Sequence, residues 1–183
     1  MTQTLTVTGI VGSLRSTSYS RQVLHSIAAL LPAGTRFETL DIGALPHYNE
    51  DLDNDAVPDA VAQSRAQVTA SDALIIVTPE FNHGLPGVLK NTLDWLSRPA
   101  FQSCFIRKPV MFATISPGAL GGVRTQSQLR ETLASMLCRL VPLPEIAVTH
   151  VGAKITDDRL TDAPTLQHVS RVLEMFLAEI AVS

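Results

Sequence analysis

The stretch from Thr78 to Gly87 has the residue types best suited to holding a ligand. Its two prolines restrict the backbone, and its two glycines let the chain approach a flat ring without a Cβ in the way. A flavin is such a ring, and Phe81 or His83 could lie against its face or edge. The alternative is a tight turn between a strand and a helix, in which Asn82 caps the helix and Glu80 is solvated.

A second polar turn, residues 12–20, offers five Ser and Thr hydroxyls and the guanidinium of Arg15. Hydroxyls and helix N-terminal amides can donate hydrogen bonds to a phosphate monoester while Arg15 neutralises its charge. The alternative is a Ser-rich N-cap that satisfies its own helix and leaves Arg15 in water. The turn is neither a G-x-G-x-x-G fingerprint nor a Walker A loop, which argues against a typical nucleotide hydrolase.

A third loop, residues 116–124, has three glycines within five residues. They would let main-chain amides close over the ring end of a ligand, and the alternative is an unusually flexible turn. The sequence does not place the residues that other catalytic chemistry or a metal site would need. Glu80 has no partner placed for glycosidase chemistry, His83 has no nearby nucleophile, and no residues have the spacing of metal ligands.

The bulk composition predicts one soluble domain spanning residues 1–183. Of these residues 45% are apolar and 17% are charged, which is enough apolar material for a sizeable core. A net charge of −3 without a Lys/Arg cluster gives no reason to expect a nucleic-acid partner. Two cysteines without paired spacing indicate a reduced, cytoplasmic chain, and we expect no signal peptide and no membrane span.

Alternating hydrophobic patterns predict five strands and five helices. The strands are expected at 5–11, 36–40, 73–77, 109–115 and 145–149. The helices are expected at 19–31, 58–68, 88–96, 123–140 and 165–182. A long polar surface loop is expected at 41–55.

This element order predicts an α/β fold, a flavodoxin-like three-layer sandwich with a five-stranded parallel sheet of order 2-1-3-4-5 and helices on both faces. In that order the switch point lies between the first and third strands. Those are the strands that run into the 12–20 turn and the 78–87 loop. Two independent patterns therefore meet at one place.

Three segments carry a resemblance to a known family: Gly-Ser-Leu-Arg with the serines after it at 12–20, the run from Pro79 to Pro99, and the glycine loop from Ser116 to Gln126. They resemble the NADPH-dependent FMN reductases of the flavodoxin-like superfamily, which includes bacterial quinone and chromate reductases and azoreductase-like enzymes. The resemblance spans most of the chain, and its long middle motif is highly specific.

The resemblance implies FMN as cofactor and assigns three groups of residues to it. The FMN phosphate would be held by Ser13, Arg15, Ser18 and Ser20. The isoalloxazine would be bordered by Pro79, Glu80, Phe81 and Asn82, and its pocket closed by Ser116, Gly118, Gly121 and Gly122. This sequence has Phe81 where the family usually has Tyr, and Ser20 where Asn is frequent.

The resemblance also implies that NAD(P)H reduces FMN and that a quinone, free flavin, azo compound or metal oxyanion then takes the electrons. It favours NADPH, whose 2′-phosphate Arg15 could meet, and a homodimer or homotetramer, with the 41–55 loop in the acceptor wall. No side-chain nucleophile or base is required, because hydride acceptance is the chemistry of the flavin. A flavodoxin-type electron carrier and a flavin-free sensor or scaffold are the alternatives.

Overall fold

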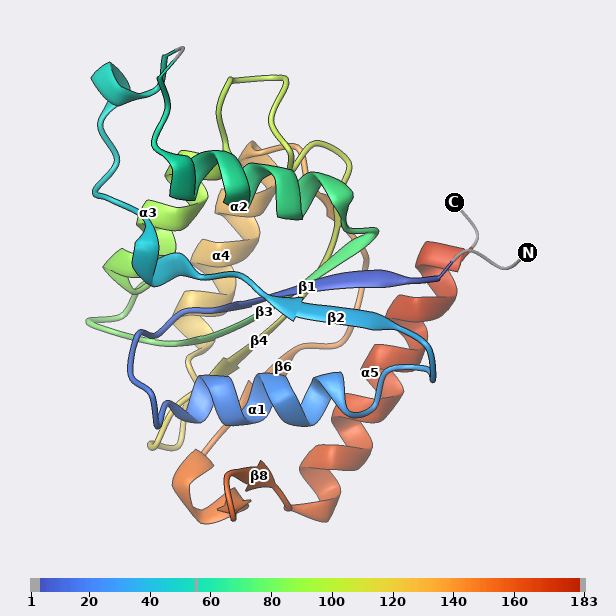
Figure 1. Cartoon of the computed structure of the whole chain (residues 1–183). Helices are drawn as coiled ribbons and strands as arrows, with labels where there is room; N and C mark the ends of the chain where they lie inside the picture. The colour runs from blue at the N-terminus through green and yellow to red at the C-terminus, as the bar shows by residue number, and fades with distance from the viewer. Residues whose placement is uncertain (1–3, 55, 182–183) are drawn as a thin grey trace.

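A parallel sheet forms the middle layer of the computed structural model, which describes residues 4–54 and 56–181 (Figure 1). Its strands run in the order β2-β1-β3-β4-β5, and β6 also pairs with β4. The strands are β1 (Thr6–Val11), β2 (Arg36–Thr39), β3 (Ala73–Pro79), β4 (Pro109–Ile115), β5 (Arg139–Leu140) and β6 (Ile146–Val148). This order confirms the flavodoxin-like fold.

Helices cover both faces of the sheet (Figure 1). They are α1 (Tyr19–Ala28), α2 (Asp59–Ala70), α3 (Gly87–Leu96), α4 (Val123–Ser135) and α5 (Ala163–Ala181). Short 3₁₀ turns are η1 (Ile42–Ala44), η2 (Glu50–Leu52) and η3 (Val151–Lys154), and a hairpin is formed by β7 (Ile155–Thr156) and β8 (Arg159–Leu160). The helices α1 and α5 pack on one face, and α2, α3 and α4 pack on the other.

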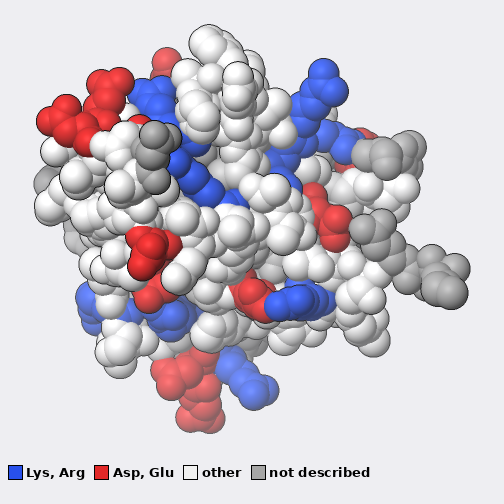
Figure 2. Space-filling view, turned by 45° about the horizontal axis from the view of Figure 1, so that its top comes forward, with Lys and Arg blue, Asp and Glu red and all other residues white. Residues whose placement is uncertain are grey.

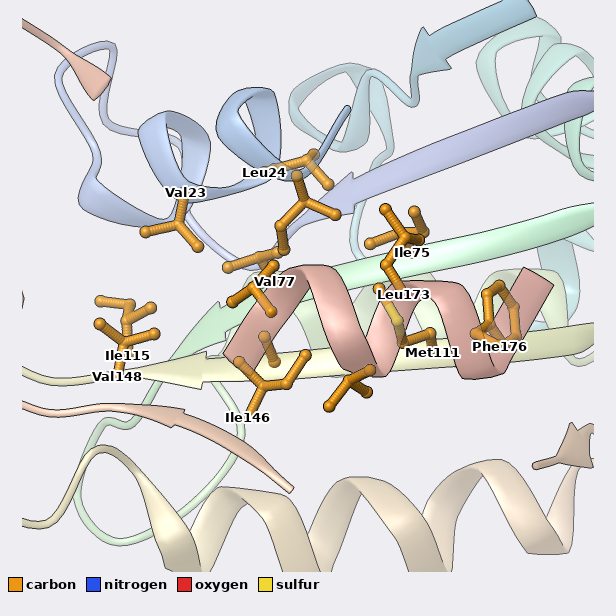
Figure 3. Packing of buried hydrophobic residues seen from close by; sticks show 14 of the residues in the cluster. Val23, Leu24, Ile75, Val77, Met111, Ile115, Ile146, Val148, Leu173 and Phe176 are labelled. Carbon is orange, nitrogen blue, oxygen red and sulfur yellow. The ribbon is translucent and has the colours of Figure 1, made fainter. Parts of the chain in front are cut away.

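The central strand β3 holds the two layers together because both of its faces are buried. Ile75 and Val77 face α1 and α5, where Leu24 and Phe176 pack against the same face of the sheet (Figure 3). Ile76 points the other way, into the cluster under α2, α3 and α4. Burial on both faces is what an unbroken apolar run in a parallel sheet requires.

The end of α4 differs from the prediction, which extended this helix to Leu140. The helix ends at Ser135, and Leu137 adopts a left-handed conformation with φ of 59°. Cys138 N–H donates to Leu133 C=O, and Leu137 N–H donates to Ala134 C=O, which is the Schellman arrangement. Leu137 therefore lies beyond the helix and is 47% exposed.

The fifth strand is split into two pieces, where one strand was predicted at 145–149. The first piece, β5, pairs with Pro109 and Val110, and β6 pairs with β4 from Ala113 onward. The predicted surface loop at 41–55 is also more ordered than expected, because it contains η1 and η2 and buries Ile42 and Leu45. Residue 55 and the predicted helix end at 182 lie outside the described residues. The β7–β8 hairpin was not predicted.

We predict that Gly12→Ala destabilises the fold, because an added Cβ would lie 2.2 Å from Thr78 Oγ1. Overpacking of this kind should lower the free energy of unfolding by about 1–3 kcal/mol, measured by urea denaturation. The control is Gly87→Ala, where an added Cβ meets nothing within 4 Å at the start of α3, so stability should hold or rise. Equal stability of the two variants would contradict the close approach of β1 and β3.

Candidate cofactor site at the carboxyl edge of the sheet

Three loops meet where β1, β3 and β4 end, at the left-hand edge of the sheet in Figure 1. They are the turn after β1 (residues 12–18), the loop after β3 (residues 80–86) and the loop after β4 (residues 116–122). Gly12 N–H donates to Val77 C=O at 2.9 Å, which continues the pairing of β1 and β3 into the first loop. The predicted site residues lie on these loops, at the end of β3 and in the first turn of α1.

The turn after β1 leaves buried hydroxyls at the start of α1. Ser18 is the N-cap residue, but its side chain makes no capping hydrogen bond, so the predicted alternative of a self-satisfied cap does not describe this residue. Ser20 is fully buried, and within the described residues its Oγ has no hydrogen-bond partner. A buried hydroxyl without a partner is unfavourable by roughly 1–3 kcal/mol, so a ligand that accepts a hydrogen bond there would be stabilising.

Arg15 lies on the same turn and is exposed. Its backbone N–H makes only a long contact of 3.4 Å with Ser13 Oγ, and its guanidinium has no ion pair with the described residues. A buried hydroxyl, a helix N-terminus and a cation thus lie within one short turn. This donor set fits a phosphate monoester.

The loop after β3 contains a two-residue hairpin turn. Phe81 and Gly84 exchange both backbone hydrogen bonds, at 3.1 and 2.9 Å. Asn82 and His83 between them have φ of 49° and 66°, as in a type I′ turn. The turn projects Phe81 outward, and this ring is 59% exposed.

Glu80 joins this loop to the start of α4. Its carboxylate accepts hydrogen bonds from the backbone N–H groups of Arg124 and Thr125, at 3.1 and 3.2 Å. Glu80 Oε1 also lies 3.8 Å from the Arg124 guanidinium. Contrary to the predicted alternative, Glu80 is not a solvated turn residue, and Asn82 does not cap α3, whose N-cap is Pro86. The carboxylate caps α4 and fixes the second and third loops relative to each other.

The loop after β4 is shaped by two buried glycines with positive φ. Gly121 has φ of 61°, and an added Cβ would lie 2.9 Å from the Ala147 carbonyl carbon. Gly122 has φ of 83° and lies against Thr114 in the same way. These contacts give both positions a steric reason to be glycine. At the open end of the loop, Gly118 N–H donates to Ser116 Oγ at 3.0 Å.

Each loop exposes one large apolar side chain at this edge. Leu14, Phe81 and Leu120 are 54%, 59% and 55% exposed. Sequence reasoning did not select Leu14 and Leu120, although an apolar residue within a polar or glycine-rich turn was the available signal. A flat ligand bound among the loops could cover this apolar surface.

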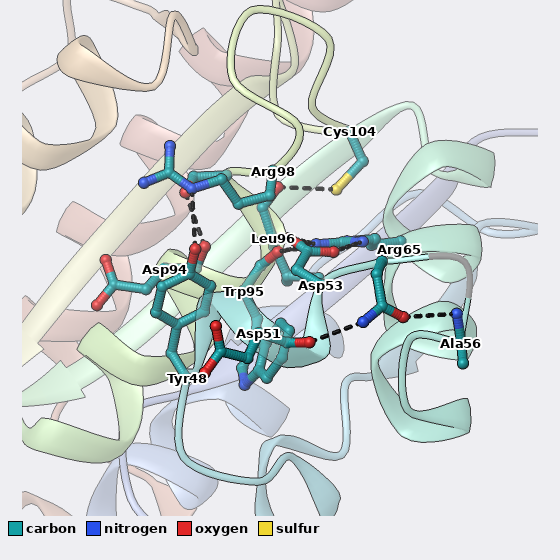
Figure 4. A network of polar contacts seen from close by, with 12 residues as sticks. Tyr48, Asp51, Asp53, Ala56, Arg65, Asp94, Trp95, Leu96, Arg98 and Cys104 are labelled. Carbon is teal, nitrogen blue, oxygen red and sulfur yellow. Dashed lines mark hydrogen bonds and ion pairs between the residues drawn. The ribbon is translucent and has the colours of Figure 1, made fainter.

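The segment that follows β2 is held against α3 by a polar network (Figure 4). Trp95 Nε1 donates to Pro46 C=O at 2.8 Å, and Asn91 contacts both Pro46 C=O and Tyr48 N–H. Arg65 forms two hydrogen bonds with Asp53, at 2.8 and 2.9 Å, and also donates to Trp95 C=O. Asn91 and Trp95, in the middle motif of the sequence, therefore anchor this segment.

The side chains capable of other chemistry are few. Burial raises the pKa of Cys104 to about 11 and that of Cys138 to about 12, so both free thiols stay protonated at neutral pH. The described part of the chain contains no group of three or more His, Cys, Asp or Glu residues that could hold a metal ion. None of its helices has the length and apolar character of a membrane span. Figure 2 shows Lys and Arg interspersed with Asp and Glu on one face.

Comparison with known proteins gives consistent results. The sequence profile of the NADPH-dependent FMN reductase family matches residues 5–153. The chain is 39% identical to a quinone reductase of Pseudomonas putida, over 100% of this chain and 98% of that one. It is 41% identical to an NAD(P)H-dependent FMN reductase of Pseudomonas aeruginosa, over 95% and 94%. FerB, a flavoenzyme NAD(P)H:(acceptor) oxidoreductase from Paracoccus denitrificans, has a similar solved structure, with a TM-score of 0.87, 33% identity and 97% coverage of both chains.

We predict that Glu80→Ala destabilises the protein without cofactor by about 0.5–2 kcal/mol, the usual effect of losing a helix N-cap. The loss follows from the two α4 amides that the carboxylate satisfies. Glu131→Ala is the matched control, because Glu131 is an exposed residue farther along α4. Urea denaturation measures both, and a Glu80→Ala protein as stable as the control would show that the cap does not support the loop.

Proposed function

The chain belongs to the NADPH-dependent FMN reductase family, and from this premise we propose that its three loops at the carboxyl edge of the sheet hold FMN. The protein is a flavodoxin-like oxidoreductase that uses FMN and NAD(P)H and acts on small-molecule acceptors. FMN, when bound, would supply the redox chemistry, namely hydride acceptance and electron transfer. The chain's own residues bind and orient the reactants.

The observation that carries the proposal is the buried Ser20 hydroxyl, which has no partner among the described residues. It lies in the first turn of α1, whose N-terminal amides favour an anion. We assign the FMN phosphate to this turn, with Ser13, Ser18 and Ser20 as hydrogen-bonding groups and Arg15 as the cation. Ser20 is shorter than the frequent Asn of the family.

The isoalloxazine is assigned to the space bordered by Pro79, Glu80, Phe81 and Asn82 on one side. Phe81 supplies an exposed aromatic surface that the I′ turn holds in place, and Glu80 contributes by fixing that loop to α4. On the other side we assign Ser116 and Gly118, with Gly121 and Gly122 shaping the loop from beneath. Leu120 adds apolar surface that excludes water from the ring.

The same residues do not supply acid or base chemistry. Glu80 is engaged by the first amides of α4 and the guanidinium of Arg124. Cys104 and Cys138 are protonated and lie in the segments that follow α3 and α4. Placement of nicotinamide, flavin and acceptor is thus the contribution that these loops can make to the rate.

A quinone is the acceptor that we propose, because several relatives at 33–39% identity are named as quinone reductases. A free flavin, an azo compound or a metal oxyanion would be handled by the same open edge. We further propose that residues 1–183 form one FMN-binding unit, that the enzyme is a cytoplasmic homodimer or homotetramer, and that the segment from 41 to 55 borders the acceptor. An electron carrier without turnover and a flavin-free scaffold have no support from these relatives.

Ser20→Ala should weaken FMN binding about tenfold, the range expected for one hydrogen bond to a charged group. The protein without FMN should keep its stability or gain some, because the variant removes a buried hydroxyl that has no partner among the described residues. Fluorescence titration with FMN and thermal unfolding of the apoprotein measure the two effects. An unchanged dissociation constant would place the phosphate elsewhere.

Ser26→Ala is the matched control in the same helix. The Ser26 hydroxyl is satisfied, since it donates to Gln22 C=O and accepts from Leu160 N–H. Its removal should lower apoprotein stability while leaving FMN affinity unchanged. Steady-state oxidation of NAD(P)H with a benzoquinone tests the activity itself, and a protein that binds no FMN or never oxidises NAD(P)H would contradict the proposed function.

A further inference from the structure

A hollow of about 310 Å³ lies between the carboxyl ends of β1 and β2. It is on the opposite side of β1 from the switch point between β1 and β3, where the FMN site is proposed. Ser13 and Leu14 line it, so it adjoins the first cofactor loop without being part of the ring pocket. The assignments made above leave this hollow without a role.

Arg21 is the residue that makes the hollow chemically distinctive. It is the third residue of α1, it is half-buried, and it lines the hollow. Within the described residues its guanidinium has no hydrogen bond and no ion pair, whereas the similarly half-buried Arg65 has three acceptors. A cation partly removed from water is stabilised when an anion lies against it, and the N-terminal end of α1 adds to this preference.

The opposite wall of the hollow offers acceptors and a hydroxyl. Asp41 lies two residues beyond the end of β2. Its Oδ1 accepts a hydrogen bond from Gly43 N–H at 3.1 Å, while Oδ2 has no partner within the described part of the chain. Thr39 lies beside it at the end of β2. In dinucleotide-binding α/β folds, a carboxylate at the end of a strand next to the phosphate loop accepts hydrogen bonds from ribose hydroxyls.

These groups match the parts of a nucleoside phosphate. Arg21 suits a phosphate, Asp41 can accept from ribose hydroxyls, and the exposed side chain of Leu14 offers an apolar wall for a base. The volume is at the lower end of small-molecule sites, which are on the order of 300–1,000 Å³, so half of a dinucleotide fits and a whole one does not. The other half would extend past the shared loop toward the flavin.

We propose that this hollow binds the adenosine half of the pyridine nucleotide, with Arg21 contacting a phosphate and Asp41 accepting from the ribose. This inference rests on the proposed function, because it concerns the electron donor of that reaction. The phosphate is either the 2′-phosphate of NADPH or the 5′-phosphates common to NADH and NADPH. The chemistry at Arg21 is the same, and the choice of probe separates the two sources.

Calorimetric titration of the FMN-saturated protein with adenosine 2′,5′-bisphosphate and with ADP tests this inference. Neither probe carries nicotinamide, so binding is measured without turnover. Arg21→Gln should weaken binding about tenfold, as expected for loss of a charge-assisted contact in a partly solvated site. Weakening of the bisphosphate alone assigns Arg21 to the 2′-phosphate, and weakening of both probes assigns it to the 5′ groups. Asp41→Asn should weaken ADP binding by severalfold.

Arg36→Gln is the control, because Arg36 is an exposed arginine at the start of β2, at the opposite edge of the sheet, and pairs only weakly with Glu38. It removes the same charge and should leave both titrations unchanged. The inference is overturned if Arg21→Gln binds both probes as the wild type does, or if the wild type binds neither. If the wild-type protein binds neither probe but still takes up FMN and oxidises NAD(P)H, the inference about the hollow fails and the proposed function stands. If the wild-type protein takes up no FMN, the proposed function fails. ADP titration of the apoprotein then tests whether the hollow binds an adenine nucleotide.

Discussion

The close contact between β1 and β3 at their carboxyl ends is the constraint on which the site depends. Gly12 lies so near Thr78 that no side chain fits between them, and its N–H continues the pairing of the strands. Parallel strands end at the same edge, so this contact brings a hydroxyl-rich turn beside a Pro/Gly loop. A phosphate and a ring can then be contacted by segments that lie far apart in the sequence.

The loops around the site are also held in place by contacts with neighbouring helices. Glu80 joins the loop after β3 to the first amides of α4, and the I′ turn at Asn82 and His83 fixes the direction in which Phe81 projects. Asn91 and Trp95 hold the segment after β2 against α3. The residues left without protein partners in the described chain, Ser20 and Arg15 among them, are the ones available to a cofactor.

Sequence reasoning predicted the sheet order and the three loops because local residue patterns indicate those features. The apolar run of β3 and the glycine turns are examples. It missed the end of α4, since the usual glycine signal of a Schellman motif is absent and Leu137 takes the left-handed position. It also missed the capping role of Glu80, whose partners are more than forty residues away. Leu14 and Leu120 stand out locally as apolar residues in polar or glycine-rich turns, but their exposure at one edge depends on how the loops assemble.

The central claim is that these loops hold FMN where a pyridine nucleotide can reduce it and an acceptor can reoxidise it. Anaerobic stopped-flow mixing of the FMN-loaded protein with NADPH or NADH tests this claim most directly. We expect the visible absorbance of the bound flavin to be lost in a single turnover, at a rate no slower than steady-state turnover, and to return when a benzoquinone is added. Bound flavin whose absorbance does not change with either nucleotide would contradict the claim.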